Sequence, residues 1–309
     1  MPLPWAALAP LAAAALWPRG AEAGSTQRAP LSLGRPRTPP LRPPRPPRGL
    51  PAEGCGEATE ALQHGGLERE YLVHRPCSDV RGVLVSVHCY GCDASMVFDP
   101  YLELAKRRGL VLIAPEGVNR SFNAVDCCGD AQRNKIDDVG FIEAAVKAQA
   151  GAQKMPLLVT GHSNGGFMSS LLALKLPGVS AIALSSGHVY AGLESLPPIP
   201  ALLLWDEQDS FVSYSGCCSD GARPCCCGIG RDVRRCVGAP EIFGAWSRAN
   251  GCASDGERED ADGGRCRRGT GCEHGGVELC TYRGHRHQAW ARIPPVVSAR
   301  VGAFFGELL

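Results

Sequence analysis

A serine set between closely spaced glycines is the strongest chemical signal in the sequence. Residues 161–166 read Gly-His-Ser-Asn-Gly-Gly, after the apolar run 156–160 and before an apolar segment of helical length. A serine on a sharp strand-to-helix turn needs small residues two positions before and after it, because neighbouring backbone comes close there. The pattern therefore predicts that Ser163 is a nucleophile whose hydroxyl is presented above a sheet.

Such a serine needs a base and an orienting acid, because a hydroxyl is a poor nucleophile near neutral pH. Both partners should follow later strands, in the chain order serine, acid, histidine. The apolar run 201–205 is followed by Asp209, and the apolar run 277–282 is followed by His285 and His287. We therefore expect Asp209 to be the acid and one of the two histidines to be the base.

Backbone donors for an oxyanion are expected at two places. The early apolar run 83–88 leads into a loop whose N–H groups at Cys89 or Tyr90 could serve, and the helix that begins at Asn164 contributes a second N–H and its positive end. His88 stands at the end of that early strand. We expect it to order the loop by hydrogen bonding rather than to act as the base.

Longer motifs accompany the serine turn and are more specific than it is. They read Ala114-Pro115-Glu116-Gly117, Ser121-Phe122-Asn123-Ala124 with Cys127-Cys128-Gly129, Asp137-Asp138-Val139-Gly140-Phe141-Ile142, and Trp246 with Asn250-Gly251-Cys252. Over roughly residues 71–290 the chain resembles secreted α/β-hydrolase esterases of the family that includes polyhydroxybutyrate depolymerases, feruloyl esterases and acetyl-xylan esterases. The resemblance implies an α/β-hydrolase fold, with a mostly parallel central sheet, helices on both faces and a Cys-rich loop insertion.

The same resemblance assigns roles position by position. It implies Ser163 as nucleophile and Asp209 as triad acid, with no metal and no organic cofactor. The histidine stays open between two positions: the distance from Gly284 favours His287, whereas matching a Gly-His pair selects His285. The family's oxyanion loop usually starts His-Gly and here reads His-Cys, so the substrate scope is expected to differ.

Apolar runs that alternate with amphipathic segments predict stacked β-α units in a single catalytic domain, residues 55–309. The predicted strands are 71–74, 83–88, 111–114, 157–160, 181–185, 201–205 and 277–282, and the predicted helices are 96–108, 138–148, 164–175, 241–250 and 298–308. Two stretches lack any apolar period. We interpret 215–237 as a disulfide-stapled loop and 253–276 as a surface insertion before the last strand.

The sequence contains 16 cysteines, which favours an oxidising compartment and several disulfides. A zinc site is the alternative, but clusters such as Cys225-Cys226-Cys227 are too tight for their side chains to surround one metal ion. The family resemblance additionally implies a disulfide between Cys252 and Cys280. The pairing of the cluster from Cys217 to Cys236 stays unassigned.

The N-terminal segment predicts export. Residues 1–23 combine an apolar stretch with the small-residue pattern Ala21-Glu22-Ala23, typical of a signal peptide cleaved after Ala23. No Lys or Arg precedes the apolar stretch, so an organelle-targeting leader or a retained anchor is the alternative. Residues 24–54 form a basic, proline-rich linker, which serves either as a spacer or as an adhesive segment for acidic polysaccharide or a membrane surface.

The expected activity is hydrolysis of carboxylic esters by an extracellular enzyme. The expected partner is an ester substrate that can be polymeric: a feruloyl or acetyl polysaccharide ester, or a polyhydroxyalkanoate-type polyester. A net charge of +1 gives no reason to expect nucleic acid as a partner, and no membrane association is expected after signal cleavage. The alternatives are a serine peptidase on the same fold, because triad chemistry does not distinguish ester from amide, and a catalytically impaired binding protein.

Overall fold

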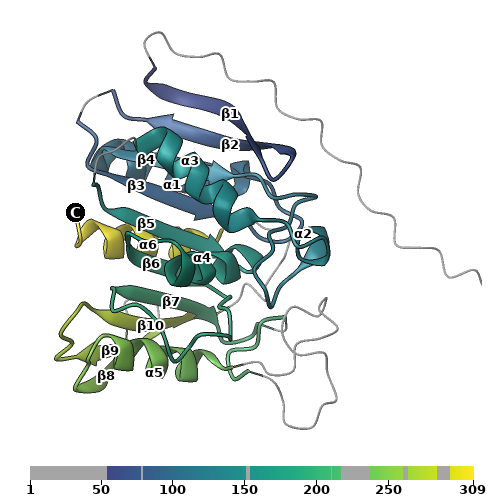
Figure 1. The fold of residues 1–309 in the computed structure, drawn as a ribbon. Helices are drawn as coiled ribbons and strands as arrows, with labels where there is room; N and C mark the ends of the chain where they lie inside the picture. The colour runs from purple at the N-terminus through teal and green to yellow at the C-terminus, as the bar shows by residue number, and fades with distance from the viewer. Residues whose placement is uncertain are drawn as a thin grey trace, which may run out of the picture. The chain divides into compact units, whose positions relative to one another are not determined.

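The computed structural model describes residues 54–77, 79–150, 154–209, 211–216, 237–259, 264–283 and 293–309, all within one compact unit. One 10-stranded sheet runs through this unit, in the order β1-β2-β4-β3-β5-β6-β7-β10-β9-β8 (Figure 1). The strands are β1 (Gly56–His64), β2 (Leu67–Arg75), β3 (Gly82–Val87), β4 (Leu110–Pro115), β5 (Leu157–His162), β6 (Val179–Ser185), β7 (Ala201–Asp206), β8 (Ser254–Glu259), β9 (Arg265–Thr270) and β10 (Val277–Tyr282).

The middle of the sheet is parallel and its two margins are antiparallel. Strands β4, β3, β5, β6, β7 and β10 run in one direction, whereas β1 pairs with β2, β2 with β4, β10 with β9, and β9 with β8 in antiparallel fashion. Every residue of β3, β4, β5 and β7 is buried, as expected for strands that are covered on both faces.

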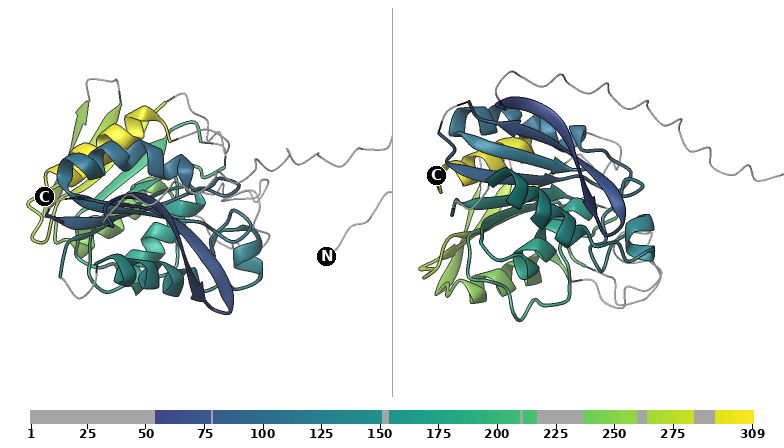
Figure 2. Two further views of the ribbon diagram at one scale, coloured as in Figure 1. Left: turned by 90° about the horizontal axis from the view of Figure 1, so that it is seen from above. Right: turned by 45° about the horizontal axis from the view of Figure 1, so that its top comes forward.

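Helices cover both faces of the sheet and divide the core into two clusters. The helices are α1 (Ser95–Arg108), α2 (Gly129–Arg133), α3 (Asp138–Ala150), α4 (Asn164–Lys175), α5 (Ala239–Ala249) and α6 (Pro295–Gly306). Buried residues of α3, α4 and α5 pack in one cluster, and those of α1 and α6 pack in the other. Figure 2 shows α1 and α6 side by side on their face of the sheet.

The predicted fold class is confirmed, since each predicted strand and helix is present with ends shifted by a few residues. The segment 253–276 is the main difference. The sequence predicts a surface insertion there and no strand, whereas the segment contains β8 and β9, which extend the sheet beyond β10 as an antiparallel hairpin. Strand β1 and the short helix α2 were also missed.

Disulfides pair all the cysteines of the described residues, which confirms the prediction of several disulfides. The pairs are Cys55–Cys77, Cys89–Cys92, Cys127–Cys128, Cys252–Cys272 and Cys266–Cys280. The cluster from Cys217 to Cys236 lies outside the described residues. Within the described ranges, no helix combines the length and the hydropathy needed to cross a bilayer.

The expected Cys252–Cys280 disulfide is wrong. Cys252 bonds to Cys272, and Cys280 bonds to Cys266. The physical reason is the β8–β9 hairpin, because its pairing with β10 sets Cys266 directly opposite Cys280. The resemblance concerned Cys252 and Cys280 alone, so it could not indicate that Cys266 and Cys272 are their partners.

Candidate active site

Ser163 lies on the sharp turn that the sequence predicts. Strand β5 ends at His162, helix α4 begins at Asn164, and Ser163 between them has φ 55° and ψ −120°. Positive φ is uncommon for a residue with a side chain and is characteristic of strained functional turns. The Ser163 N–H donates to the carbonyl of Ser185 at 2.9 Å, and the Ser163 carbonyl accepts from the N–H of Phe167 at 3.0 Å. These bonds hold the turn between β6 and the first turn of α4.

The glycines around the serine are needed because there is no space for a side chain at their positions, not because the backbone must be flexible there. A Cβ on Gly161 would collide with the carbonyl oxygen of Gly165, and a Cβ on Gly165 would collide with that of Val87. Gly165 therefore lets α4 approach the end of β3, where the loop with Cys89 and Tyr90 begins. The expected assignment of oxyanion donors to Cys89, Tyr90 and Asn164 stays a prediction, which this close approach supports.

The loop after β3 is ordered by His88, as predicted. Its Nδ1 donates to the carbonyl of Cys89 at 2.8 Å, and its Nε2 accepts from the N–H of Gly117 at 3.0 Å. Burial of the imidazole lowers the pKa of His88 to about 4, so the ring is neutral near pH 7. The loop is closed further by the Cys89–Cys92 disulfide.

Asn164 does more than supply an N–H at the helix start. Its buried carboxamide accepts from the N–H of Phe122 at 2.8 Å and donates to the carbonyls of Phe122 and Cys127 at 3.0 and 3.1 Å. The side chain next to the nucleophile thus fixes the segment that holds the Cys127–Cys128 disulfide. This explains physically why the serine turn and the Ser-Phe-Asn-Ala…Cys-Cys-Gly motif occur together.

Asp138 secures the same segment from its other side. Its carboxylate accepts from the N–H of Asn123 and from Nη2 of Arg69, each at 2.7 Å, and both charged side chains are almost fully buried. A buried carboxylate is tolerated when it is paired and hydrogen-bonded in this way. The Asp-Asp-Val-Gly-Phe motif is therefore part of the support of the site and not of its chemistry.

Asp209 follows the carboxyl end of β7, in the loop where the triad acid is expected. The residue is 6% exposed, and its Oδ1 accepts from the N–H groups of Phe211 and Val212 at 2.9 and 2.8 Å. These bonds fix the orientation of one carboxylate oxygen.

The candidate bases His285 and His287 lie outside the described residues, and the structure therefore does not choose between them. The strand before them is well placed. Strand β10 runs parallel to β7 with Tyr282 opposite Asp206, so the carboxyl ends of both strands lie on the same side of the molecule and the chain leaves both strands there. The Tyr282 hydroxyl lies 3.2 Å from Oγ of Ser185, which lies 3.1 Å from Nδ1 of His162.

Sequence reasoning missed Glu207, which joins three segments of the site. Its carboxylate accepts from Nε of Arg283 at 2.8 Å, from Oγ1 of Thr281 at 3.0 Å and from Nη2 of Arg265 at 3.1 Å. The hydrogen bond from Arg283 holds the pKa of Glu207 below its ordinary value. An acid two residues before the predicted triad acid was a usable signal, but its partners come from β9 and β10, whose pairing was not predicted.

Comparison with known proteins shows which fold the chain shares with solved structures, but it identifies no protein family. No protein-family model matches the chain, and no curated protein matches it. Among solved structures it is similar to LpqC, a poly(3-hydroxybutyrate) depolymerase from Bordetella parapertussis, at 15% identity and TM-score 0.51, covering 82% of this chain and 91% of that one.

Two further structures have comparable similarity. Esterase PE8 matches at 17% identity and TM-score 0.50, covering 77% of this chain and 97% of that one. TT1662 from Thermus thermophilus matches at 13% identity and TM-score 0.50, covering 81% and 97%. At such identities the likeness establishes the α/β-hydrolase fold, which the sequence predicted, and leaves activity to be argued from the site.

Proposed function

We propose that the protein is a secreted serine hydrolase of carboxylic esters in which Ser163, Asp209 and His287 form the triad, with His285 as the alternative base. The observation that carries the proposal is the positive-φ turn at Ser163, at the carboxyl end of β5. Strands β5, β7 and β10 run in the same direction, and the chain leaves them toward Ser163, Asp209 and the two histidines. That arrangement is the one a Ser-Asp-His order needs.

The proposed reaction has two halves. His287 takes the proton of the Ser163 hydroxyl while its oxygen attacks the ester carbonyl, and Asp209 holds the imidazole in the required tautomer. The negative charge on the carbonyl oxygen is stabilised by N–H groups at Cys89 or Tyr90 and at Asn164. The C–O bond to the alcohol then breaks as His287 returns the proton, and water attacks the acyl-enzyme by the same steps.

The substrate class is a feruloyl or acetyl polysaccharide ester or a polyhydroxyalkanoate-type polyester. Support comes from the motif of residues 121–129, in which Phe122 and Cys127 hydrogen-bond to Asn164 beside the nucleophile, and from the likeness to the fold of a depolymerase and an esterase. The disulfides support an extracellular location for residues 55–309, after removal of a leader at residues 1–23 and with residues 24–54 as linker.

The test is turnover by the secreted protein of p-nitrophenyl acetate, methyl ferulate and a hydroxybutyrate oligomer, beside Ser163→Ala, His285→Ala and His287→Ala. We expect the Ser163→Ala variant to lose activity by a factor on the order of 10⁴ or more, and only one histidine variant to lose it comparably. A fluorophosphonate probe that labels wild type and not Ser163→Ala identifies the nucleophile independently of substrate choice.

The rival functions give different outcomes in the same assays. A peptidase would be labelled by the probe and would cleave peptide amides with higher kcat/KM than esters of matched acyl group. An impaired binding protein would be folded yet neither labelled nor active. Either result would overturn the proposal.

A further inference from the structure

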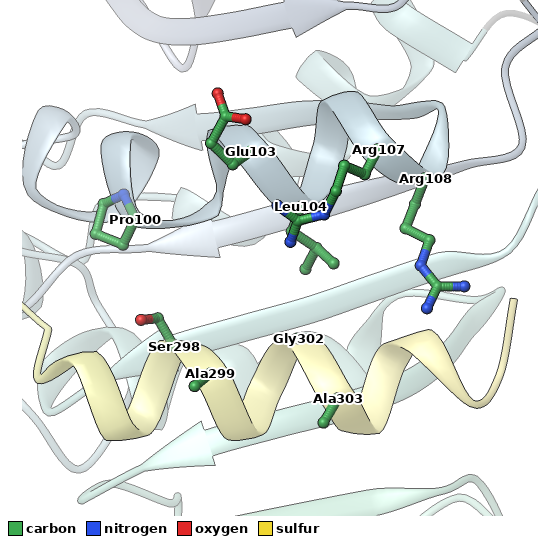
Figure 3. A pocket seen from close by; sticks show the side chains of 9 residues that line it. All are labelled: Pro100, Glu103, Leu104, Arg107, Arg108, Ser298, Ala299, Gly302 and Ala303. Carbon is green, nitrogen blue, oxygen red and sulfur yellow. The ribbon is translucent and has the colours of Figure 1, made fainter.

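Helix α6 borders two pockets that lie on the face of the sheet occupied by α1 and α6. One, of about 450 Å³, lies between α1 and α6, and Figure 3 shows Arg107 and Arg108 extending toward the small side chains of α6. The other, of about 120 Å³, lies between α6 and strands β9 and β10, and its wall includes the Cys266–Cys280 disulfide. The second pocket combines a reactive bond with a charged lining.

The lining of the second pocket is electropositive. Among the described residues that line it, three are arginines, Arg258, Arg268 and Arg300, and two are acids, Glu278 and Glu307, which gives this part of the lining one net positive charge. Arg268 pairs with Glu278 at 2.5 Å. Arg300 is directed at the disulfide itself, because its Nη1 lies 2.9 Å from Sγ of Cys266. A guanidinium at that distance stabilises a thiolate, and a stabilised thiolate is the better leaving group.

We propose that the Cys266–Cys280 disulfide is a thiol–disulfide exchange site for a small anionic thiol. A pocket of about 120 Å³ has room for the thiol-bearing end of a small reductant and none for a folded protein, and the arginine excess attracts a negatively charged molecule. The proposed exchange reaction does not depend on the proposed function. The effect that we expect it to have on ester turnover rests on that function.

The exchange proceeds by displacement at Cys280. The thiolate of the reductant forms a bond to Sγ of Cys280, the bond between Cys280 and Cys266 breaks, and its electron pair leaves on Cys266 beside Arg300. A second reductant thiolate then attacks the reductant sulfur of the mixed disulfide and releases the Cys280 thiolate. Altogether two thiols are oxidised to one small disulfide, and the protein disulfide is reduced to two thiols.

A metal site is the competing use of the same atoms. One ligand atom from each of Cys266, Glu278 and Cys280 lies within 4.8 Å of the others. However, Arg300 contacts Cys266 and Arg268 pairs with Glu278, so two of the three ligand groups already face a cation. Their repulsion of a metal ion favours the exchange reaction.

The disulfide is connected to the candidate active site through Glu207. Arg265 and Thr281, the neighbours of Cys266 and Cys280 in sequence, both donate to the Glu207 carboxylate. The same carboxylate accepts from Arg283, which follows β10 on the way to the candidate bases. Opening the disulfide removes the covalent link between β9 and β10 at that point and leaves only their strand pairing, so we expect it to loosen the loop between Asp206 and Asp209 and to lower turnover.

Cys252–Cys272 provides a matched control within the same molecule. It closes the neighbouring part of the β8–β9 region and is more exposed than Cys266–Cys280, whose cysteines are 3% and 2% exposed. Within the described part of the chain, no arginine donates to its sulfurs. Exposure alone therefore predicts that Cys252–Cys272 opens first, whereas the charge of the pocket predicts the reverse for an anionic thiol.

The experiment exposes the native protein to glutathione, which is anionic, or to cysteamine, which is cationic, at equal thiolate concentration. Differential alkylation and peptide mass spectrometry then follow each disulfide. With glutathione, we expect Cys266–Cys280 to open about tenfold faster than with cysteamine, ahead of Cys252–Cys272, and the mixed disulfide to form on Cys280. Arg300→Gln and the exposed Arg258→Gln should each reduce the preference for glutathione.

The outcomes separate the two proposals. Opening of Cys252–Cys272 first with both thiols, equal rates for both thiols, or an adduct on Cys266 would overturn the exchange site. Turnover of p-nitrophenyl acetate, measured after selective opening, tests only the link to catalysis. If wild type has no turnover before any reduction, the proposed function fails while the mass-spectrometric result still decides the exchange proposal.

Discussion

Nε of Arg283 donates to the carboxylate of Glu207 at 2.8 Å, which joins the residue that follows β10 to the loop that carries Asp209. The predicted acid and the predicted bases belong to those two loops. The Glu207 side chain is 19% exposed and its arginine partners are largely exposed, so each ion pair is weak on its own. Glu207 therefore holds the two loops together through its three hydrogen bonds in combination.

Glu207→Gln should therefore lower ester turnover without unfolding the protein. We expect kcat/KM to fall about fivefold, corresponding to about 1 kcal/mol. High salt should lower the kcat/KM of the wild type toward that of the variant, because it screens the ion pairs of Glu207. Glu143→Gln is the control, because Glu143 forms an exposed pair with Lys147 on α3, away from these loops. Equal kcat/KM for wild type and Glu207→Gln at low salt would remove Glu207 from the support of the site.

Gly165→Ala should prevent the native turn from forming. Its Cβ would collide with the Val87 carbonyl, which is backbone in a central strand and cannot move aside. We expect a large fall in melting temperature or no soluble protein. Gly256→Ala is the control, since a Cβ there meets nothing within 4 Å, and its effect should stay within about 0.5 kcal/mol. A Gly165→Ala protein with wild-type melting temperature would contradict the close approach of α4 to β3.

Acidification should weaken the fold through His188. Nε2 of His188 accepts from Nε1 of Trp246 at 2.9 Å, and burial lowers its pKa to about 4. The unfolded chain binds this proton near pH 6.5 and the native state does not, so the free energy of unfolding falls as the pH drops from 6.5 toward 4. The contribution of the group is on the order of 3 kcal/mol over that window.

Denaturant unfolding followed by tryptophan fluorescence at several pH values measures this dependence. His188→Gln removes the titrating ring and should give a shallower slope between pH 4 and 6.5, whereas His274→Gln, on an exposed side chain, is the control. An unchanged slope in His188→Gln would rule out His188 as a source of the acid sensitivity.

Glu116 should have the opposite effect on the pH dependence of the free energy of unfolding, because it stabilises the fold more at low pH. Burial raises the pKa of its carboxyl to about 7, although Oε2 accepts from the N–H of Ala94 at 2.8 Å. The native state then holds a proton that the unfolded chain has lost, so this group's stabilising contribution is complete below about pH 4.5 and disappears as the pH rises through 7.

Glu116→Gln keeps an oxygen that can accept from Ala94 and removes the charge. We expect it to raise the melting temperature at pH 8 and to leave it unchanged at pH 4. The same substitution at exposed Glu259, on β8, is the control. A Glu116→Gln protein less stable than wild type at pH 8 would show that the ionised carboxylate is needed in the folded state.

The central sheet and the serine turn could be predicted because their signals are local. Strands such as β3 and β5 are continuous apolar runs, and the Gly-x-Ser-x-Gly spacing reflects collisions among neighbouring residues. Strand β8 could not be predicted in this way. All six of its residues are exposed and its sequence is Ser-Asp-Gly-Glu-Arg-Glu, so it is a strand only because β9 pairs with it.

The residues that hold the candidate site in place were indicated only by the family resemblance of their motifs. The motifs indicated that Asn164, Asp138 and the segment 121–129 belong together, but the reason is a set of hydrogen bonds between residues about 15 to 42 positions apart. Glu207 depends in the same way on partners 58 to 76 positions away. Such contacts follow from the way strands, helices and loops pack together, and no local spacing in the sequence encodes them.

The charged strand β8 also determines how this sheet ends. An edge strand offers unpaired backbone groups to any other strand, and apolar edges promote stacking of one molecule on another. Here the edge strand carries Asp255, Glu257, Arg258 and Glu259, with charges of both signs in close succession. A second molecule that paired its own β8 there would have to strip water from these charges. The hairpin that positions the disulfide therefore also protects the protein against aggregation through this edge.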